Sequence, residues 1–269
     1  MATQPPESGR LSAMAPHQAR AWAESFGSDP ARYDRARPRY PDALVRALVA
    51  AAPGRDVLDV GCGTGISARA FQAAGCRVLG VDVDERMAGF ARARGLPVEI
   101  GTFEAWDPGG RTFDLVVAGQ TWHWIDPVAG AAKAAEVLRP GGGLAVFWNA
   151  PAPSTTVRDA FSEVYARIFP DWNPWARPAA DAYGAIIGRA ADGIAETGAF
   201  GPAERSRFDW ERSYTRDEWL EQIPTGGDAS QFAPETLAAL LAALGAAIDE
   251  LGGAFTMGYA SLAVSAPRR

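Results

Sequence analysis

Short apolar runs alternate with helical patterns through the first half of the chain. Runs at residues 57–60, 76–82, 97–101, 113–119 and 144–148 predict buried strands. The segments between them carry apolar residues at helical spacing, with Pro, Gly and Asp near their ends. This regular alternation predicts an α/β fold with a doubly wound sheet.

The second half of the chain has a different pattern. Residues 151–201 carry aromatic side chains among prolines and short helical patterns, which predicts an inserted helical layer over the strand ends. Residues 204–212 then alternate as a strand, and Thr215 begins a capped helix. An alanine–leucine helix over 234–251 and a strand over 255–264 complete the chain.

Three glycines at alternate positions follow the first strand. Gly61, Gly63 and Gly65 stand between that strand and the helix that begins near Ile66. Glycines at such a turn permit positive φ and let a ligand approach the bare backbone. The dinucleotide fingerprint requires its third glycine at position 66, which is isoleucine here, so a nicotinamide site is disfavoured.

The segment Asp59-Val60-Gly61-Cys62-Gly63-Thr64-Gly65 resembles motif I of class I S-adenosylmethionine (SAM)-dependent methyltransferases. Two further stretches are similar to that family: a Gln-x-x-His-Trp turn at 120–124, typical of the trans-aconitate and farnesoate-type branch, and Leu-Arg-Pro-Gly-Gly at 138–142. The resemblance extends from about Tyr33 to Asn149. It implies a seven-stranded Rossmann-like sheet, mostly parallel with an antiparallel edge hairpin, SAM as cofactor and a small-molecule acceptor.

On this resemblance the chain divides into five segments. They are a disordered tail at 1–12, an N-terminal lid at 13–40, a SAM-binding α/β core at 41–150, a helical substrate roof at 151–201 and a strand–helix–strand segment at 202–269 that completes the sheet.

The cofactor contacts follow in part from spacing and in part from the resemblance. Asp82 ends the second strand 23 residues after Asp59, close to the roughly 20 residues over which a βαβ unit places an acid beside a ribose. Asp82 could instead cap the next helix, although Asp84 fits that cap better. The residues predicted to bind SAM are Tyr33, Arg37, Asp59, Gly61, Cys62, Gly63, Gly65, Asp82, Val83, Met87, Phe103, Glu104 and Gln120.

The acceptor is expected at the carboxyl ends of the fourth and fifth strands, where open α/β sheets bind ligands. The residues predicted there are Trp122, His123, Trp124, Trp148 and Asn149. His123 is the candidate general base and Trp122 the candidate aromatic face for the sulfonium. A structural role for His123, hydrogen-bonded through one ring nitrogen, is the alternative.

The segment from Phe26 to Tyr40 is expected to be a mobile lid. Gly27 and Pro30 are interpreted as breaks, and the resemblance places Tyr33 over the ligand and Arg37 at the methionine carboxylate. A solvated segment with its tyrosines packed on the core is the alternative.

Composition narrows the class of protein. The net charge of −6 argues against a broad nucleic-acid surface, and no apolar run has the length of a membrane span. Two cysteines and no Cys/His cluster argue against a structural zinc site, so no metal is expected. We expect a cytoplasmic monomer or homodimer.

These observations predict methylation of a carboxyl or hydroxyl oxygen of a small molecule, achieved mainly by alignment and exclusion of water. An N- or C-methyltransferase, a SAM-binding regulatory protein without turnover, and a nicotinamide oxidoreductase are the alternatives.

Overall fold

The computed structural model describes residues 27–269, so the predicted tail at 1–12 and the predicted lid residues 13–26 lie outside the described residues. The chain forms two compact units. Among the described residues, unit 1 comprises 27–37, 150–182 and 209–260, and unit 2 comprises 38–149, 183–208 and 261–269. The predicted roof at 151–201 is therefore divided between the units.

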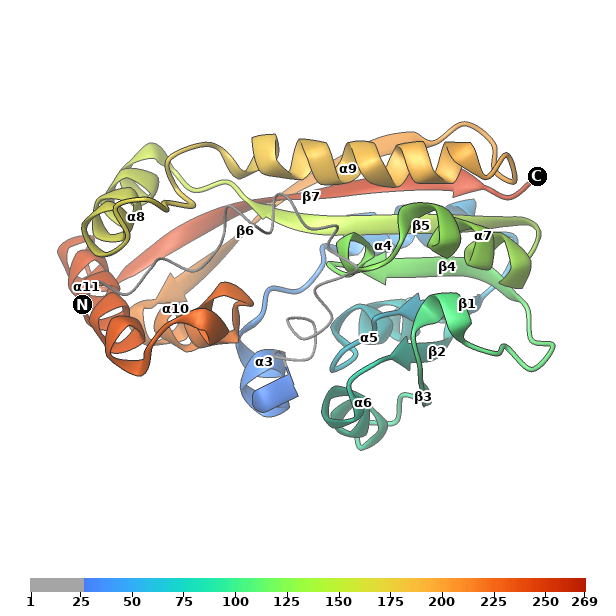
Figure 1. Cartoon of the computed structure of the whole chain (residues 1–269), viewed down its shortest axis with the longest axis horizontal. Helices are drawn as coiled ribbons and strands as arrows, with labels where there is room; N and C mark the ends of the chain where they lie inside the picture. Colours follow the sequence, from blue (N-terminus) through green and yellow to red (C-terminus); the bar gives the residue numbers. More distant parts are fainter. Residues whose placement is uncertain (1–26) are drawn as a thin grey trace. The chain divides into compact units, whose positions relative to one another are not determined.

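The strands form one seven-stranded sheet in the order β3-β2-β1-β4-β5-β7-β6 (Figure 1). Their bounds are β1 Asp56–Val60, β2 Arg77–Asp82, β3 Val98–Ile100, β4 Phe113–Gly119, β5 Leu138–Pro151, β6 Glu204–Thr215 and β7 Ala254–Pro267. The pairs β1–β2, β1–β4, β2–β3 and β4–β5 are parallel. Antiparallel strands at the edge complete this mixed sheet. The predicted mostly parallel Rossmann-like sheet is confirmed.

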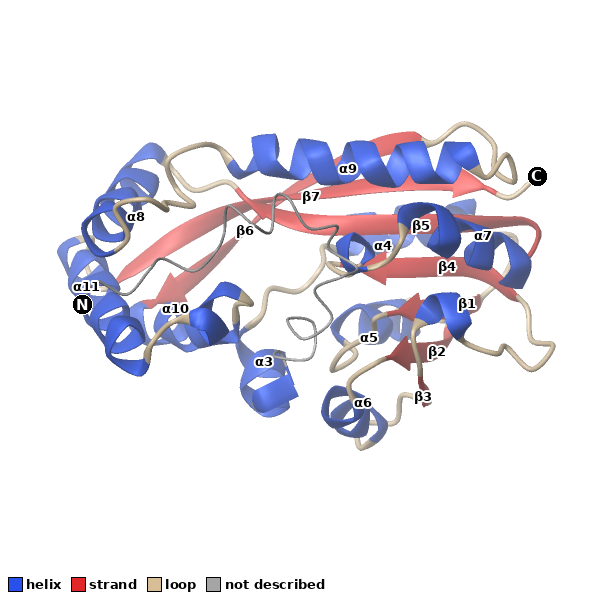
Figure 2. Ribbon diagram, viewed as in Figure 1, coloured by secondary structure: helices blue, strands red, loops and turns tan. Residues whose placement is uncertain are grey.

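Helices connect the parallel strands of unit 2 (Figure 2). The α-helices are α3 Pro30–Ala36, α4 Asp42–Ala51, α5 Ile66–Ala73, α6 Glu85–Arg92, α7 Pro127–Val137, α8 Thr155–Ile168, α9 Ala179–Glu196, α10 Arg216–Gln222 and α11 Pro234–Glu250. The short 3₁₀ turns are η3 Phe103–Ala105, η4 Trp122–Trp124, η5 Ile223–Thr225 and η6 Asp228–Gln231. Two predicted caps are confirmed, since Asp84 caps α6 and Thr215 forms a capping box with Glu218.

Unit 2 buries both faces of its parallel strands. Along β4, Leu115 and Val117 join one apolar cluster while Val116 and Ala118 join another. A parallel sheet needs this arrangement, because its crossover helices cover both faces. The strand ends are therefore held by two packed layers.

Unit 1 has an aromatic core of its own. Phe161 of α8 lies 5.5 Å from Trp219 and 5.2 Å from Phe255, measured between ring centroids. Leu240 and Leu244 of α11 are fully buried in the same cluster. The helices α8, α10 and α11 thus form one packed group, whereas Ile187, Ala190 and Ile194 of α9 pack into the core of unit 2.

Two local predictions are wrong. Pro30 does not break the backbone: Asp29 accepts a hydrogen bond from the Arg32 N–H and Pro30 begins α3, because proline suits the first position of a helix. The strand predicted to begin at 144 begins earlier: the Leu-Arg-Pro-Gly-Gly stretch at 138–142 lies inside β5, which pairs with β4 from Leu138 onward across an irregularity in register. Gly141 supplies positive φ there, at 76°.

Candidate active site

The glycine loop joins the carboxyl end of β1 to the start of α5. Gly61, Gly63 and Gly65 all have positive φ, at 62°, 56° and 85°. The Gly61 N–H donates to the Val81 carbonyl over 2.7 Å, which fastens the loop to the end of β2. The three glycines therefore permit a backbone path that L side chains rarely adopt.

Glycine is also required at position 61 because a side chain there would have no room. A Cβ at Gly61 would lie 2.0 Å from Cγ2 of Thr121, the residue that follows β4 by two positions. The Thr121 Oγ1 lies 3.1 Å from the Gly61 carbonyl oxygen. The loop after β1 and the turn after β4 are thus in direct contact.

The turn after β4 holds a residue in an unusual conformation. Gln120 has φ 57°, and it is the non-glycine residue with positive φ in the described part of the chain. Its N–H donates to the Phe147 carbonyl over 2.8 Å, and its Nε2 lies 3.4 Å from the Asn149 carbonyl oxygen. Such strain is typical of functional sites.

Asp82 connects the loop to the next helix. Its Oδ2 accepts from the Gly63 N–H over 2.7 Å, and its Oδ1 accepts from the Asp84 N–H over 2.9 Å. Burial raises the pKa of Asp82, and these two bonds partly offset the rise. The backbone of Val83 is a third donor to this carboxylate. A carboxylate accepts about four hydrogen bonds, so acceptor capacity remains for a ribose hydroxyl.

Asp59 lies wholly inside the molecule. Its Oδ2 accepts from the Ser67 hydroxyl at the start of α5, whereas its Oδ1 has no hydrogen-bond partner among the described residues. Burial, together with the charge of Asp82, raises the pKa of Asp59 to about 7. The Asp59 carboxyl therefore connects β1 to α5 through Ser67. It keeps its proton up to a pH of about 7.

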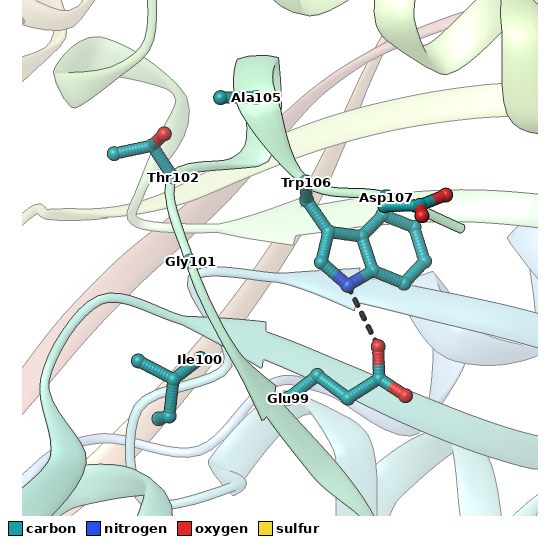
Figure 3. Close-up of a pocket in the computed structure, with 7 residues that line it drawn as sticks. All are labelled: Glu99, Ile100, Gly101, Thr102, Ala105, Trp106 and Asp107. Atoms are coloured by element: carbon teal, nitrogen blue, oxygen red, sulfur yellow. Dashed lines mark hydrogen bonds between the residues drawn. The ribbon is translucent and has the colours of Figure 1, made fainter. Parts of the chain in front are cut away.

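A cavity of about 360 Å³ lies beside the carboxyl end of β3 (Figure 3). Its lining residues are Glu99, Ile100, Gly101, Thr102, Ala105, Trp106 and Asp107. The Trp106 Nε1–H donates to Glu99 Oε2 over 2.8 Å, as Figure 3 shows, and Arg111 pairs with both oxygens of Glu99. The Gly101 N–H donates to the Asp82 backbone carbonyl over 2.9 Å. The cavity therefore lies next to Asp82, the residue predicted to bind the ribose.

The remaining predicted cofactor residues of unit 2 lie around this loop. Met87 is buried, and its Cε lies 3.5 Å from the position of a Cβ at Gly63. Cys62 and Phe103 are buried, and Val83 is partly buried. Glu104 accepts from the Asp126 N–H over 3.1 Å, which gives it a structural partner at the start of α7.

Tyr33 and Arg37 lie in unit 1. The Arg37 guanidinium lies 5.0 Å from the centroid of the Tyr33 ring, and its Nη2 donates to the Thr225 carbonyl. Their contact with the cofactor stays a prediction.

His123 has a defined partner on its Nδ1 side. The Trp148 Nε1–H lies 3.2 Å from His123 Nδ1, and an indole nitrogen only donates. Nδ1 is therefore the acceptor, and the proton of the neutral ring lies on Nε2. Burial, with the charge of Arg189, lowers the pKa of His123 to about 4, which keeps the ring neutral near pH 7.

The other residues predicted to bind the methyl acceptor are buried or partly buried. Trp122 is 2% exposed and belongs to the apolar cluster, with its ring centroid 6.4 Å from that of Phe103. Asn149 is buried, where it donates to the Arg39 carbonyl and accepts from the Ser261 hydroxyl. Trp124 is partly buried, with its ring centroid 4.8 Å from that of His123. Trp148 and Asn149 thus position their neighbours.

The sequence interpretation missed three features of this region. Thr121 follows Gln120 in the recognised turn, and its contact with Gly61 depends on the three-dimensional approach of two loops. Gly101, Thr102 and Trp106 follow the third strand, where open α/β sheets hold ligands, and that position was the available signal. Arg189 lies on α9, and nothing local in the sequence connects it to His123.

Within residues 27–269 no three His, Cys, Asp or Glu side chains gather closely enough to hold a metal ion. In the same range, none of the helices combines the length and apolar character needed to cross a membrane.

Comparisons with known proteins agree with this geometry. Residues 57–142 match the methyltransferase domain family. An uncharacterized methyltransferase of Mycobacterium tuberculosis is 40% identical over 128 residues, which are 46% of this chain and 52% of that protein. The ubiquinone biosynthesis O-methyltransferase of Aromatoleum aromaticum is 35% identical over 97 residues, which are 33% of this chain and 42% of that enzyme. The chain spans about half the length of these curated relatives.

A solved structure supports the fold over most of the chain. A candidate type II methyltransferase from Anaeromyxobacter dehalogenans superposes with a TM-score of 0.63 and 23% identity, covering 86% of this chain and 97% of that one. The sheet order, with Asp82 at the end of β2, describes this fold in the chain. The chain therefore has a Rossmann-like methyltransferase fold, and its residues 57–142 match the methyltransferase domain family.

Proposed function

We propose that this protein transfers a methyl group from SAM to a carboxyl oxygen of a small molecule. The observation that carries the first half of this proposal is the bond between the Gly63 N–H and Asp82, which joins a glycine-rich loop to a buried carboxylate. The loop offers bare backbone for the methionine part of SAM, and Asp82 retains acceptor capacity for a ribose hydroxyl. The cavity beside β3 suits the adenine, because it adjoins Asp82 through Gly101.

SAM supplies a methyl carbon already activated by its sulfonium. The residues of this chain would therefore orient the donor and the acceptor and keep water away. Transfer to an ionised carboxylate needs no general base, whereas transfer to a hydroxyl or an amine does.

The state of His123 favours the carboxylate. Its Nδ1 is occupied by Trp148 and its Nε2 carries the proton, so the ring presents a donor rather than a base. A pKa of about 4 also makes it a weak base at neutral pH. His123 is thus suited to orient an acceptor oxygen, in place of the general-base role considered from the sequence.

Methylation of a hydroxyl oxygen is the second candidate. The named O-methyltransferase among the relatives supports oxygen as the methylated atom, although it matches only part of this chain. N- or C-methylation and a SAM-binding protein without turnover are further outcomes of the same test. A cytoplasmic location and a monomeric or homodimeric state complete the proposal.

Incubation with SAM carrying a ¹³C-methyl group, and with a panel of small acids, phenols and amines, tests this function. We expect labelled methyl esters, which release labelled methanol in alkali, while ethers and N- or C-methyl products are stable to that treatment. Labelled products that all resist alkali would contradict carboxyl methylation, and absence of any labelled product would support the binding protein without turnover.

A further inference from the structure

The strand β6 forms one edge of the sheet (Figure 1). Among the described residues, β7 is its one neighbour in the sheet, so the backbone N–H and C=O groups along its other side have no strand to pair with. β6 has twelve residues, whereas β3 at the opposite edge has three. A long open edge of this kind is a ready site for pairing with a further strand.

The two faces of β6 differ in exposure. On one face, Trp210 stacks on Tyr259 of β7 with 4.6 Å between the ring centroids, and Tyr214 is fully buried. Successive side chains of a strand point to opposite faces, so the residues at odd positions share the other face. The charged residues at those positions, all of them exposed, are Arg205, Arg207, Asp209 and Glu211.

The order of these four charges is self-complementary. Two basic residues precede two acidic ones on one face of the strand. If two copies of β6 run antiparallel about a two-fold axis at Phe208, perpendicular to the sheet, residues at equal distances on either side of Phe208 lie opposite each other. Arg205 then faces Glu211 of the second copy, and Arg207 faces Asp209. Opposite charges at directly facing positions stabilise a strand pair, and like charges destabilise it.

Other registers lose this match. An axis moved by one residue, to Arg207 or to Asp209, places that residue opposite its own copy, so like charges meet. The axis at Phe208 also places Glu204 opposite Arg212 on the second face. The sequence of β6 therefore favours a single antiparallel arrangement of two copies.

We propose that the β6 strands of two copies of this chain pair antiparallel about Phe208, so that the protein is a homodimer whose two sheets are joined at this edge. Charges on an edge strand commonly keep other strands away, and any mixture of charges does so. Pairing of two copies needs basic and acidic residues in mirrored positions about one point, which is the order found here. The backbone ladder supplies affinity, and the facing charges set the register and exclude other strands.

Sedimentation velocity of the full chain and of two charge-reversed variants tests this inference. Arg207 and Asp209 also have contacts within their own chain, so the variants change the outer pair. Arg205→Glu places a carboxylate opposite Glu211, and Glu211→Arg places a guanidinium opposite Arg205, at two positions of each dimer. We expect the wild type to dimerise, and each variant alone to have its dimer dissociation constant raised by roughly ten- to hundredfold.

An equimolar mixture of the two variants is the decisive sample. The Arg205→Glu chain carries acids at both outer positions and the Glu211→Arg chain carries bases at both, so one chain of each restores every facing pair of opposite charges. We expect the mixture to dimerise as the wild type does, which also shows that both variants are folded. Arg94→Glu and Glu250→Arg are the matched controls, because they reverse exposed charges outside β6, and both should dimerise as the wild type does.

A cysteine at the axis gives a second readout of the register. Phe208→Cys should form a disulfide with its own copy, because directly opposite residues of antiparallel strands have Cα atoms about 4.5–5.5 Å apart, which is within disulfide range. Ser206→Cys is the control, since its own copy lies about four residues further along the strand and should not be linked.

Three results overturn the inference: a wild-type chain that stays monomeric at every concentration, a dimer that both charge reversals leave intact, or equal crosslinking of Phe208→Cys and Ser206→Cys. A monomeric wild type assigns the edge of β6 to another occupant, such as residues 1–26 of the same chain or a different protein. Because mass and crosslinking are measured without SAM, failure of this inference leaves the methyltransferase proposal unaffected.

Discussion

Gly61→Ala should destabilise the protein by roughly 2–5 kcal/mol and abolish cofactor binding. Alanine at φ 62° costs about 1–2 kcal/mol in backbone strain, and its Cβ would meet Thr121 Cγ2 at 2.0 Å, for which overpacking adds about 1–3 kcal/mol. The loop and the turn after β4 must then separate, which removes the bare backbone from the site. Chemical denaturation and titration with S-adenosylhomocysteine measure the two effects.

Gly75→Ala is the matched control for backbone strain. Gly75 has φ 84° but no atom within 4 Å of its added Cβ, so alanine there should cost only about 1–2 kcal/mol and leave binding intact. Adding Thr121→Ser to Gly61→Ala removes Cγ2 and should recover part of the lost stability. Equal costs for Gly61→Ala and Gly75→Ala would show that the contact between the two loops is unimportant.

Asp59→Asn should stabilise the protein at alkaline pH, by up to about 4 kcal/mol. Burial raises the pKa of Asp59 from 3.8 to about 7, so the folded chain keeps a proton that the unfolded chain has lost. The wild type is therefore destabilised progressively as pH rises from about 4 to about 7, while asparagine is neutral throughout and can still accept from Ser67. The gain should be near zero at pH 4 and largest above pH 7.

Denaturation curves between pH 4 and pH 8.5 measure this difference. Asp192→Asn, at an exposed position of α9, is the control and should change stability by less than about 0.5 kcal/mol at every pH. A constant difference between Asp59→Asn and the wild type across this range would mean that Asp59 titrates normally. Asp59→Ala differs from both, because it also removes the acceptor for Ser67.

Local patterns predicted the parallel half of the fold well, for physical reasons. The β4 segment alternates between two buried layers, so its apolar run is continuous and the strand was predicted at 113–119, as observed. Asp84 and Thr215 are strong caps whose effect depends only on neighbouring backbone, and both were correctly assigned. Pro30 was misinterpreted as a break because proline both begins helices and ends them, and here it begins α3 after the Asp29 cap.

The site was only partly predictable, because its decisive contacts join distant segments. The glycine loop and Asp82 follow from the spacing within one βαβ unit, and the structure brings them into direct contact. The donor state of His123 depends on Trp148, which lies on another strand. The charge of Arg189, which helps to lower the pKa of His123, is carried by α9, and no periodicity in the sequence connects that helix to the turn after β4.

The central claim is that Asp82, which the glycine loop contacts through the Gly63 N–H, binds the ribose of SAM. The most direct measurement compares calorimetric titrations with S-adenosylhomocysteine and its 2′-deoxy analogue, for the wild type and for Asp82→Ala. Because Asp82 also holds Gly63, its loss should weaken binding of both ligands, but only the wild type should distinguish them, by about tenfold. Equal discrimination between the two ligands in the wild type and in Asp82→Ala, or no binding by the wild type, would contradict the account.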